Sequence, residues 1–200
     1  MENSNRHIPS SFTDKSVTRT GPKQQLGHEK LIAHTDRLEQ QLWEVTDDVW
    51  CLVGNGLSNQ TFVRGPKGII AIDTGECYEE MAAALKLLRE KTDEPIAGII
   101  YTHFHYVDGT RAILEKQETS DIPIWGHAKI EQNRRKYGME VSAVAARGLV
   151  YQFGMALPKD GPDSIINAGL GLAFRNSYHA PYSPAFVKPT NTFTESQQIE

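Results

Sequence analysis

The sequence predicts an α/β fold, and two apolar runs separated by a helical stretch are the main reason. The first run, GIIAIDTGE at 68–76, is an Ile-rich pattern typical of a buried strand and ends in an Asp-Thr-Gly turn. The second, IIYTHFHYVDGT at 99–110, stops at Thr102 and leads into a loop with two histidines. Apolar strands that alternate with helical stretches are typical of a parallel sheet.

Local patterns before the first run predict a hairpin and a bend. The stretch WEVTDDVWCLV at 43–53 indicates a strand, a turn at Asp47-Asp48 and a second strand. The Gly-rich stretch at 54–58 resembles a phosphate-binding loop at first sight. It lacks the Lys-Ser/Thr pair of such a loop and leads to the strand-like stretch 60–63, so nucleotide binding is excluded.

Periodicity between and after the two runs predicts the helices. Met81, Leu85 and Leu88 recur at spacings of four and three, which predicts a helix over about 78–91 with these side chains in the core. The remaining expected elements are a strand at 96–101, a short helix to 116, a strand at 122–125, a long helix over about 127–150 and a loop-rich segment at 154–182.

His103 and His105 are the candidate metal ligands. Side chains two positions apart in an extended chain point the same way, so these imidazoles can share one face of a cleft. Zinc binds neutral imidazole and is typically four-coordinate, so two histidines supply half of a zinc site. A His-x-His pair alone does not establish a metal site, because most such pairs are ordinary surface or hydrogen-bonded histidines.

Three stretches together resemble the alkyl sulfatase branch of the metallo-β-lactamase superfamily. They are WCLVGNGLSNQTFVRGPKGIIAIDTGE (50–76), YTHFHYVDGT (101–110) and RGLVYQFG (147–154). The resemblance covers roughly 38–193 and implies an αβ/βα sandwich. It also implies a zinc-dependent hydrolase that cleaves sulfate esters of long-chain alcohols with metal-activated water.

The metal motif departs from the superfamily pattern His-x-His-x-Asp-His, in which the Asp-His pair serves a second metal ion. This sequence has Val107 and Asp108 at the last two positions, so the second metal site lacks at least one ligand. Asp108 is nevertheless a candidate ligand, and its carboxylate suits Mg or Mn about as well as Zn. The alternative is that Asp108 caps the following helix.

Other residues have weaker links to the site. The resemblance implies that Asp73, at the end of the first run, supports the metal-binding loop from a second shell, and a plain turn residue is the alternative. His179 lies at a distance along the chain compatible with a third ligand, and His127 opens a helical stretch. Tyr178 and Tyr182 would line the entrance to the cleft. No catalytic residue is assigned.

The resemblance also bears on domain organisation. Such sulfatases are several hundred residues long, form homodimers and carry further metal ligands downstream, so the chain is interpreted as the N-terminal half of the sandwich. The expected division is a polar, disordered arm at 1–36 and a truncated domain at 37–200. The last residues, 188–200, resemble the entry into a further strand.

Composition limits the partners and the compartment. A net charge of -4 provides no basic surface for nucleic acid. No apolar run approaches the roughly 18 residues of a membrane span, and the start lacks the apolar region of a secretory signal, so the cytoplasm is expected. Cys51 and Cys77 are expected to be small apolar residues, not a disulfide. The expected partner is a small alkyl ester.

Two other functions remain open. One is a different hydrolase of the same fold that acts on a lactone or thioester and uses His179. The other is a non-catalytic member of the fold that binds a ligand or partner.

Overall fold

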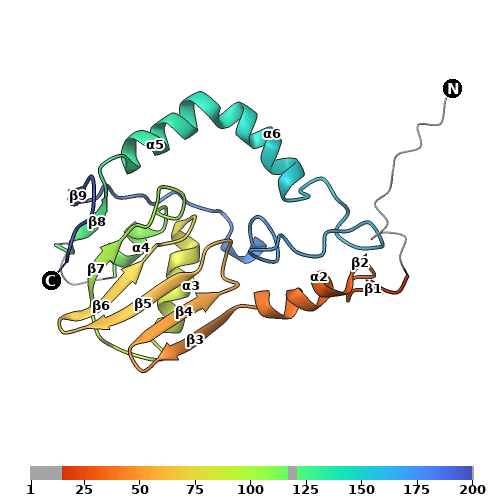
Figure 1. The fold of residues 1–200 in the computed structure, drawn as a ribbon. Coiled ribbons are helices and arrows are strands. Elements are labelled where there is room, and N and C mark those ends of the chain that lie inside the picture. The colour runs from red at the N-terminus through yellow and green to blue at the C-terminus, as the bar shows by residue number, and fades with distance from the viewer. Residues whose placement is uncertain (1–14, 117–120, 200) are drawn as a thin grey trace.

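A seven-stranded sheet forms the body of the chain, for which a computed structural model describes residues 15–116 and 121–199 (Figure 1). The strands follow one another across the sheet in sequence order. They are β3 (Gln41–Thr46), β4 (Val49–Val53), β5 (Gln60–Gly65), β6 (Gly68–Ile72), β7 (Ile96–Ile100), β8 (Ile124–His127) and β9 (Asn191–Phe193).

The sheet is antiparallel at one end and parallel at the other. Strands β3 to β6 pair antiparallel, and β6 to β9 pair parallel. Helix α3 (Tyr78–Leu88) connects β6 to β7, and α4 (Thr110–Leu114) connects β7 to β8. The expected α/β class and the hairpin around Asp47 and Asp48 are therefore confirmed. Strand β9 also confirms that the last residues enter a strand.

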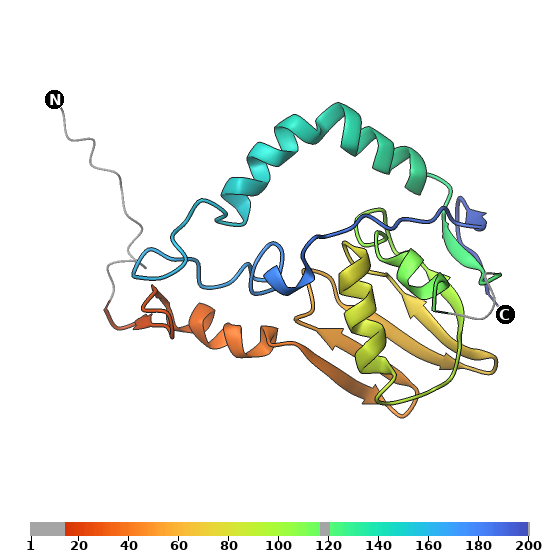
Figure 2. The same ribbon diagram turned by 180° about the vertical axis from the view of Figure 1, so that it is seen from behind.

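Helices α3 and α4 cover one face of the sheet (Figure 2). The expected helical stripe, Met81, Leu85 and Leu88, packs there with sheet residues such as Phe62 and Ile99 in one buried cluster. Burial of these side chains is the main stabilising term for this half of the fold, since each contributes roughly 1.5–3 kcal/mol.

The opposite face of the sheet is apolar but only partly buried. The register places one cross-strand row on this face, formed by Trp43, Cys51, Thr61, Ile72 and Ile100. Trp43 is 49% exposed and Val45 60% exposed. No described helix lies in front of this face in Figure 1. It has the composition of a surface that packs against another layer, as in the sandwich that the sequence predicts.

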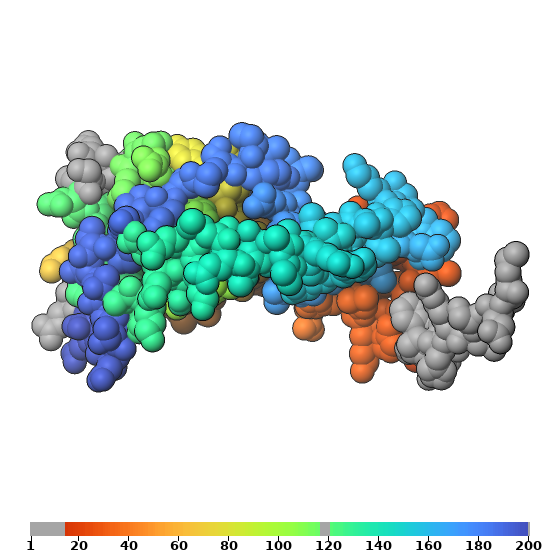
Figure 3. All heavy atoms as spheres, turned by 90° about the horizontal axis from the view of Figure 1, so that it is seen from above, coloured from red at the N-terminus to blue at the C-terminus, as the bar shows by residue number. Residues whose placement is uncertain are grey.

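The long helical stretch after β8 arches away from the sheet. It consists of α5 (Ile130–Lys136), the π-helical η2 (Tyr137–Val141) and α6 (Ser142–Gln152), which form a ridge along the molecule in Figure 3. The expected single helix at 127–150 is therefore interrupted by a π-helical turn. None of the helices in the described residues has the length and apolar character needed to cross a membrane.

The segment expected to be a disordered arm is ordered from residue 15. It contains β1 (Thr18–Thr20), β2 (Leu26–His28), α2 (Glu29–His34) and the 3-10 helix η1 (Thr35–Leu38). The physical reason is contact with the distant loop 161–169: the Asn167 side chain donates to Leu31 O and to Thr35 Oγ1. Residues 1–14 lie outside the described residues, and the domain boundary at 37 stays a prediction.

The uncovered sheet face predicts self-association of the 200-residue chain by itself. Apolar faces without a covering layer associate with one another. The double substitution Val49→Lys, Val63→Glu places an ion pair across β4 and β5 on this face and should convert oligomers to monomer in size-exclusion chromatography, with little change in Tm. The control Phe62→Glu, on the covered face, should unfold the chain. A wild-type chain that is a monodisperse monomer would contradict the prediction.

Candidate active site

The candidate site lies where β6 and β7 end. Because the two strands are parallel, the turn after β6 and the loop after β7 meet at one edge of the sheet. Thr74 N donates to Tyr106 O at 2.8 Å, and Asp108 N donates to Gly75 O at 3.0 Å. Gly109 lies so close to the Thr74 carbonyl that a Cβ would collide with it. These contacts hold the loop that carries His103 and His105 (the histidine loop) against the Asp-Thr-Gly turn at 73–75 (the acidic turn).

Asp73 is connected to His103 through Thr102. The Thr102 amide donates to Asp73 Oδ1 at 2.9 Å, and the Thr102 hydroxyl donates to Asp73 Oδ2 at 2.6 Å. That hydroxyl lies 2.9 Å from His103 Nδ1 and, having used its proton, accepts from it. The His103 Nε2 lone pair is therefore left for a ligand. This is the arrangement of a residue that supports a metal-binding histidine.

Backbone geometry and burial also set Asp73 apart from an ordinary turn residue. Its φ is 57°, in the left-handed region that few residues other than Gly, Asn and Asp adopt. Burial raises the pKa of Asp73, while the two hydrogen bonds from Thr102 and the charge of His103 lower it, and the net direction is upward.

His105 lies among aromatic rings beside His103. The two imidazole centroids are 5.2 Å apart, and Phe104 and Tyr137 pack on the His105 ring. Desolvation by these neighbours, then the charges of His103 and Arg134, lower the pKa of His105. The imidazole is therefore neutral at pH 7, which is the form that binds a metal ion.

Asp108 is paired with Arg134 of α5. Arg134 Nη2 donates to Asp108 Oδ1 at 2.7 Å, and Nη1 donates to Oδ2 at 2.9 Å. The helix-cap alternative is wrong, because Gly109 is the N-cap of α4 and no side chain caps this helix. The Arg134 guanidinium therefore competes with a metal ion for Asp108, because it already binds both carboxylate oxygens.

The two more distant histidines have other partners. The buried His179 lies 2.9 Å from Asn55 O through Nε2, and since a carbonyl only accepts, this nitrogen carries the proton. His127 donates from Nε2 to Thr194 O and accepts from Lys129 N at Nδ1. Both rings are used to fix local structure. The Tyr178 hydroxyl lies in the same region and donates to Gly54 O.

A metal ion would find two suitable donors here, His103 Nε2 and His105. Among residues 15–116 and 121–199, no three His, Cys, Asp or Glu side chains lie close enough together to hold an ion. The histidine pair could supply two of the four ligands of a zinc ion, and its role as a metal-binding pair stays a prediction. Cys51 and Cys77 are both free.

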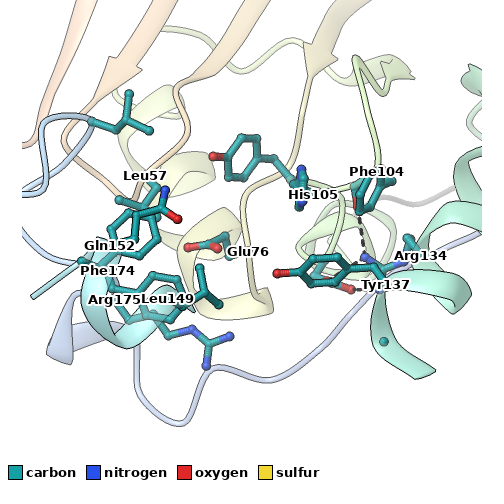
Figure 4. A pocket seen from close by; sticks show the side chains of 15 residues that line it. Leu57, Glu76, Phe104, His105, Arg134, Tyr137, Leu149, Gln152, Phe174 and Arg175 are labelled. Atoms are coloured by element: carbon teal, nitrogen blue, oxygen red, sulfur yellow. Dashed lines mark hydrogen bonds and ion pairs between the residues drawn. The ribbon is translucent and has the colours of Figure 1, made fainter. Parts of the chain in front are cut away.

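A cavity of about 560 Å³ opens beside His105 and is lined by both charged and apolar side chains (Figure 4). The acidic and basic lining residues are His105, Asp108, Arg134, Glu76 and Arg175. The apolar lining residues are Leu57, Phe104, Leu149, Phe153, Leu170 and Phe174. A small molecule with one charged end and one apolar end matches this lining.

Glu76 and Arg175 are site residues that sequence reasoning missed. Glu76 lies in the middle of the lining in Figure 4. Burial, then the neighbouring charge of Glu80, raises the pKa of Glu76 to about 7. Arg175 stacks near Phe174 and Tyr182, and within the described chain it forms no ion pair. The available signal was an acidic residue directly after the Asp-Thr-Gly turn.

Replacing Glu76 with glutamine should stabilise the protein above neutral pH. The raised pKa means that the folded state holds this proton more tightly than the unfolded state does. The stabilising contribution is present below about pH 4.5 and is lost as the pH rises through about 7. Glu76→Gln removes this loss, so its Tm relative to wild type should increase by several degrees between pH 5 and 8.

Glu79→Gln is the matched control for this experiment. Burial raises the pKa of Glu79, but its hydrogen bonds with Ser183 outweigh this and the net direction is downward. This variant should lose Tm relative to wild type as the pH rises above about 4. Parallel pH curves for wild type and Glu76→Gln would contradict the assignment of Glu76.

The chain is similar in sequence to known sulfatases. The linear primary-alkylsulfatase of a Pseudomonas species is 31% identical over 139 residues, which are 67% of this chain and 25% of that protein. The alkyl/aryl-sulfatase BDS1 of Saccharomyces cerevisiae is 27% identical over 151 residues, 73% of this chain and 23% of that protein. The chain thus spans about a quarter of the length of these curated relatives.

Solved structures give the same fold. A double mutant of the sec-alkyl sulfatase PisA1 matches 93% of this chain and 29% of its own at a TM-score of 0.72 and 20% identity. The inverting sec-alkylsulfatase Pisa1 from Pseudomonas sp. matches 89% of this chain and 32% of its own at 0.67 and 18% identity. The family model of the metallo-beta-lactamase superfamily matches residues 53–185, so the chain belongs to this superfamily.

Proposed function

We propose that this chain supplies part of the active site of a hydrolase that cleaves sulfate esters of long-chain alcohols. The observation that carries the proposal is the cavity, whose lining combines His105, the neighbour of His103, with the Arg175 guanidinium and several apolar side chains. The resemblance to alkyl sulfatases over two thirds of the chain supports the same substrate class.

We infer zinc as the metal, held by His103 and His105 together with donors from outside the described residues. The superfamily implies a metal cofactor. Neutral imidazole favours zinc, and the Asp73–Thr102–His103 hydrogen bonds fix the tautomer that exposes Nε2. Bound zinc would lower the pKa of its water to about 7 and so provide hydroxide at neutral pH.

The side chains around the cavity have separate roles in this proposal. Arg175 attracts the sulfate group, because a cation that forms no ion pair within the described residues is available to an anion. The wall that includes Leu149 and Phe174 binds the alkyl chain. Glu76, with a pKa of about 7, can hold or release a proton near the ester oxygen at neutral pH.

The cellular setting also stays a proposal. We propose a small alkyl ester as the partner, the cytoplasm as the compartment, and a homodimer for the longer protein, as the resemblance implies.

Binding of short alkyl sulfates tests the substrate class. Hexyl, octyl and decyl sulfate, kept below micelle-forming concentrations, should bind about fourfold more tightly per added methylene, because each buried CH₂ contributes roughly 0.8 kcal/mol. Arg175→Gln should weaken octyl sulfate about tenfold or more by calorimetry. The exposed Arg135→Gln, outside the cavity lining, is the control. Equal binding of octanol and octyl sulfate would oppose the proposal.

Turnover of dodecyl sulfate by the 200-residue chain, with zinc added, should be near background. Two histidine donors do not complete the cage for metal-activated water, which is the main source of acceleration. Val107→Asp with Asp108→His should not restore turnover. Clear turnover by the unmodified chain, abolished by His103→Ala, would show that the chain holds a complete site.

A further inference from the structure

A fixed positive charge already occupies the position beside Asp108. Both Asp108 oxygens accept hydrogen bonds from the Arg134 guanidinium, at 2.7 and 2.9 Å. The side chains are mostly buried, with 25% exposure for Arg134 and 19% for Asp108. In each of the other ion pairs of the described residues, both side chains are more exposed than those of Arg134 and Asp108.

Arg134 is also fixed from two further directions. Its Nη1 donates to Phe104 O, the carbonyl between the two histidines, at 3.3 Å. Its guanidinium carbon lies 4.3 Å from the centre of the Phe186 ring. Because these contacts already fix the planar guanidinium, it loses little additional side-chain entropy when it binds the Asp108 carboxylate.

We propose that Arg134 replaces the second metal ion of this site, so that the site takes a single metal ion, on the His103 and His105 side. This inference rests on the proposed metal-dependent function. It departs from the family motif, in which the equivalent positions bind a second metal ion.

Electrostatics favours the guanidinium over a second ion. A divalent cation at Asp108 would have to break two charge-assisted hydrogen bonds. It would also leave the displaced Arg134 charged and close to the ion, at the cost of like-charge repulsion in a partly buried site. No His lies at 106–108 to offset this cost, since the residues there are Tyr106, Val107 and Asp108.

Arg134 is therefore a positioning residue as well as a counter-charge. It joins α5 to the histidine loop at both Phe104 and Asp108. Loss of its charge should change metal stoichiometry, whereas loss of a merely structural contact would change stability alone.

Titration of the 200-residue chain with zinc chloride tests the stoichiometry. Wild type should take one equivalent, His105→Ala should lose it, and Asp108→Asn should keep the affinity within about threefold. Removal of a true ligand or its support typically costs 10–100-fold or more. Two tight equivalents in wild type, or a tenfold loss in Asp108→Asn, would overturn the proposal.

Arg134→Met and Arg134→Lys complete the test. Arg134→Met keeps a long stem but frees the carboxylate, so a second, weaker zinc equivalent should appear, and Arg134→Lys, which keeps the charge, should show only one. A single equivalent in Arg134→Met would overturn the proposal.

A double-mutant cycle of Arg134→Met and Asp108→Asn supplies a readout that needs no metal. Tm should decrease by several degrees in each single variant and decrease no further in the double variant, because the two residues form one pair. Additive losses would overturn the pairing. Failure of wild type to bind zinc would refute the proposed metal function, while the cycle would still decide whether the pair exists.

Discussion

The pairing of the acidic turn with the histidine loop is the constraint on which the rest of the site depends. Thr74 and Gly75 bond across to Tyr106 and Asp108, so two loops that leave parallel strands become one unit. Backbone hydrogen bonds of this kind fix position without using side chains. The side chains of Asp73, Thr102 and His103 are then free to form the hydrogen-bonded series that orients the imidazole.

Helix α5 adds an electrostatic constraint to this unit. Its Arg134 lies 26 residues beyond Asp108 in the sequence, yet the Arg134 guanidinium neutralises that carboxylate and donates to the Phe104 carbonyl. The histidines are thus kept between two supports, Asp73 on the strand side and Arg134 on the helix side. Asp73 acts on His103 through Thr102, whereas Arg134 binds the Phe104 carbonyl and Asp108.

The sequence predicts the features that depend on neighbouring residues. The apolar run that stops at Thr102 predicted that His103 and His105 follow a strand end, and the spacing of Met81, Leu85 and Leu88 predicted the covering helix. It could not predict contacts closed by distant segments. Arg134 reaches Asp108 from another helix, and the order of residues 18–38 depends on Asn167, more than 100 positions away.

The charges around the cavity couple anion binding to protonation. With its pKa at about 7, Glu76 is close to half protonated at neutral pH. A sulfate group beside Arg175 would add negative charge near Glu76 and raise this pKa further. Anion binding therefore takes up a proton, by thermodynamic linkage. Under the proposed function, burial and the charge of Glu80, which disfavour the Glu76 carboxylate, would also keep a proton available for the leaving alcohol oxygen.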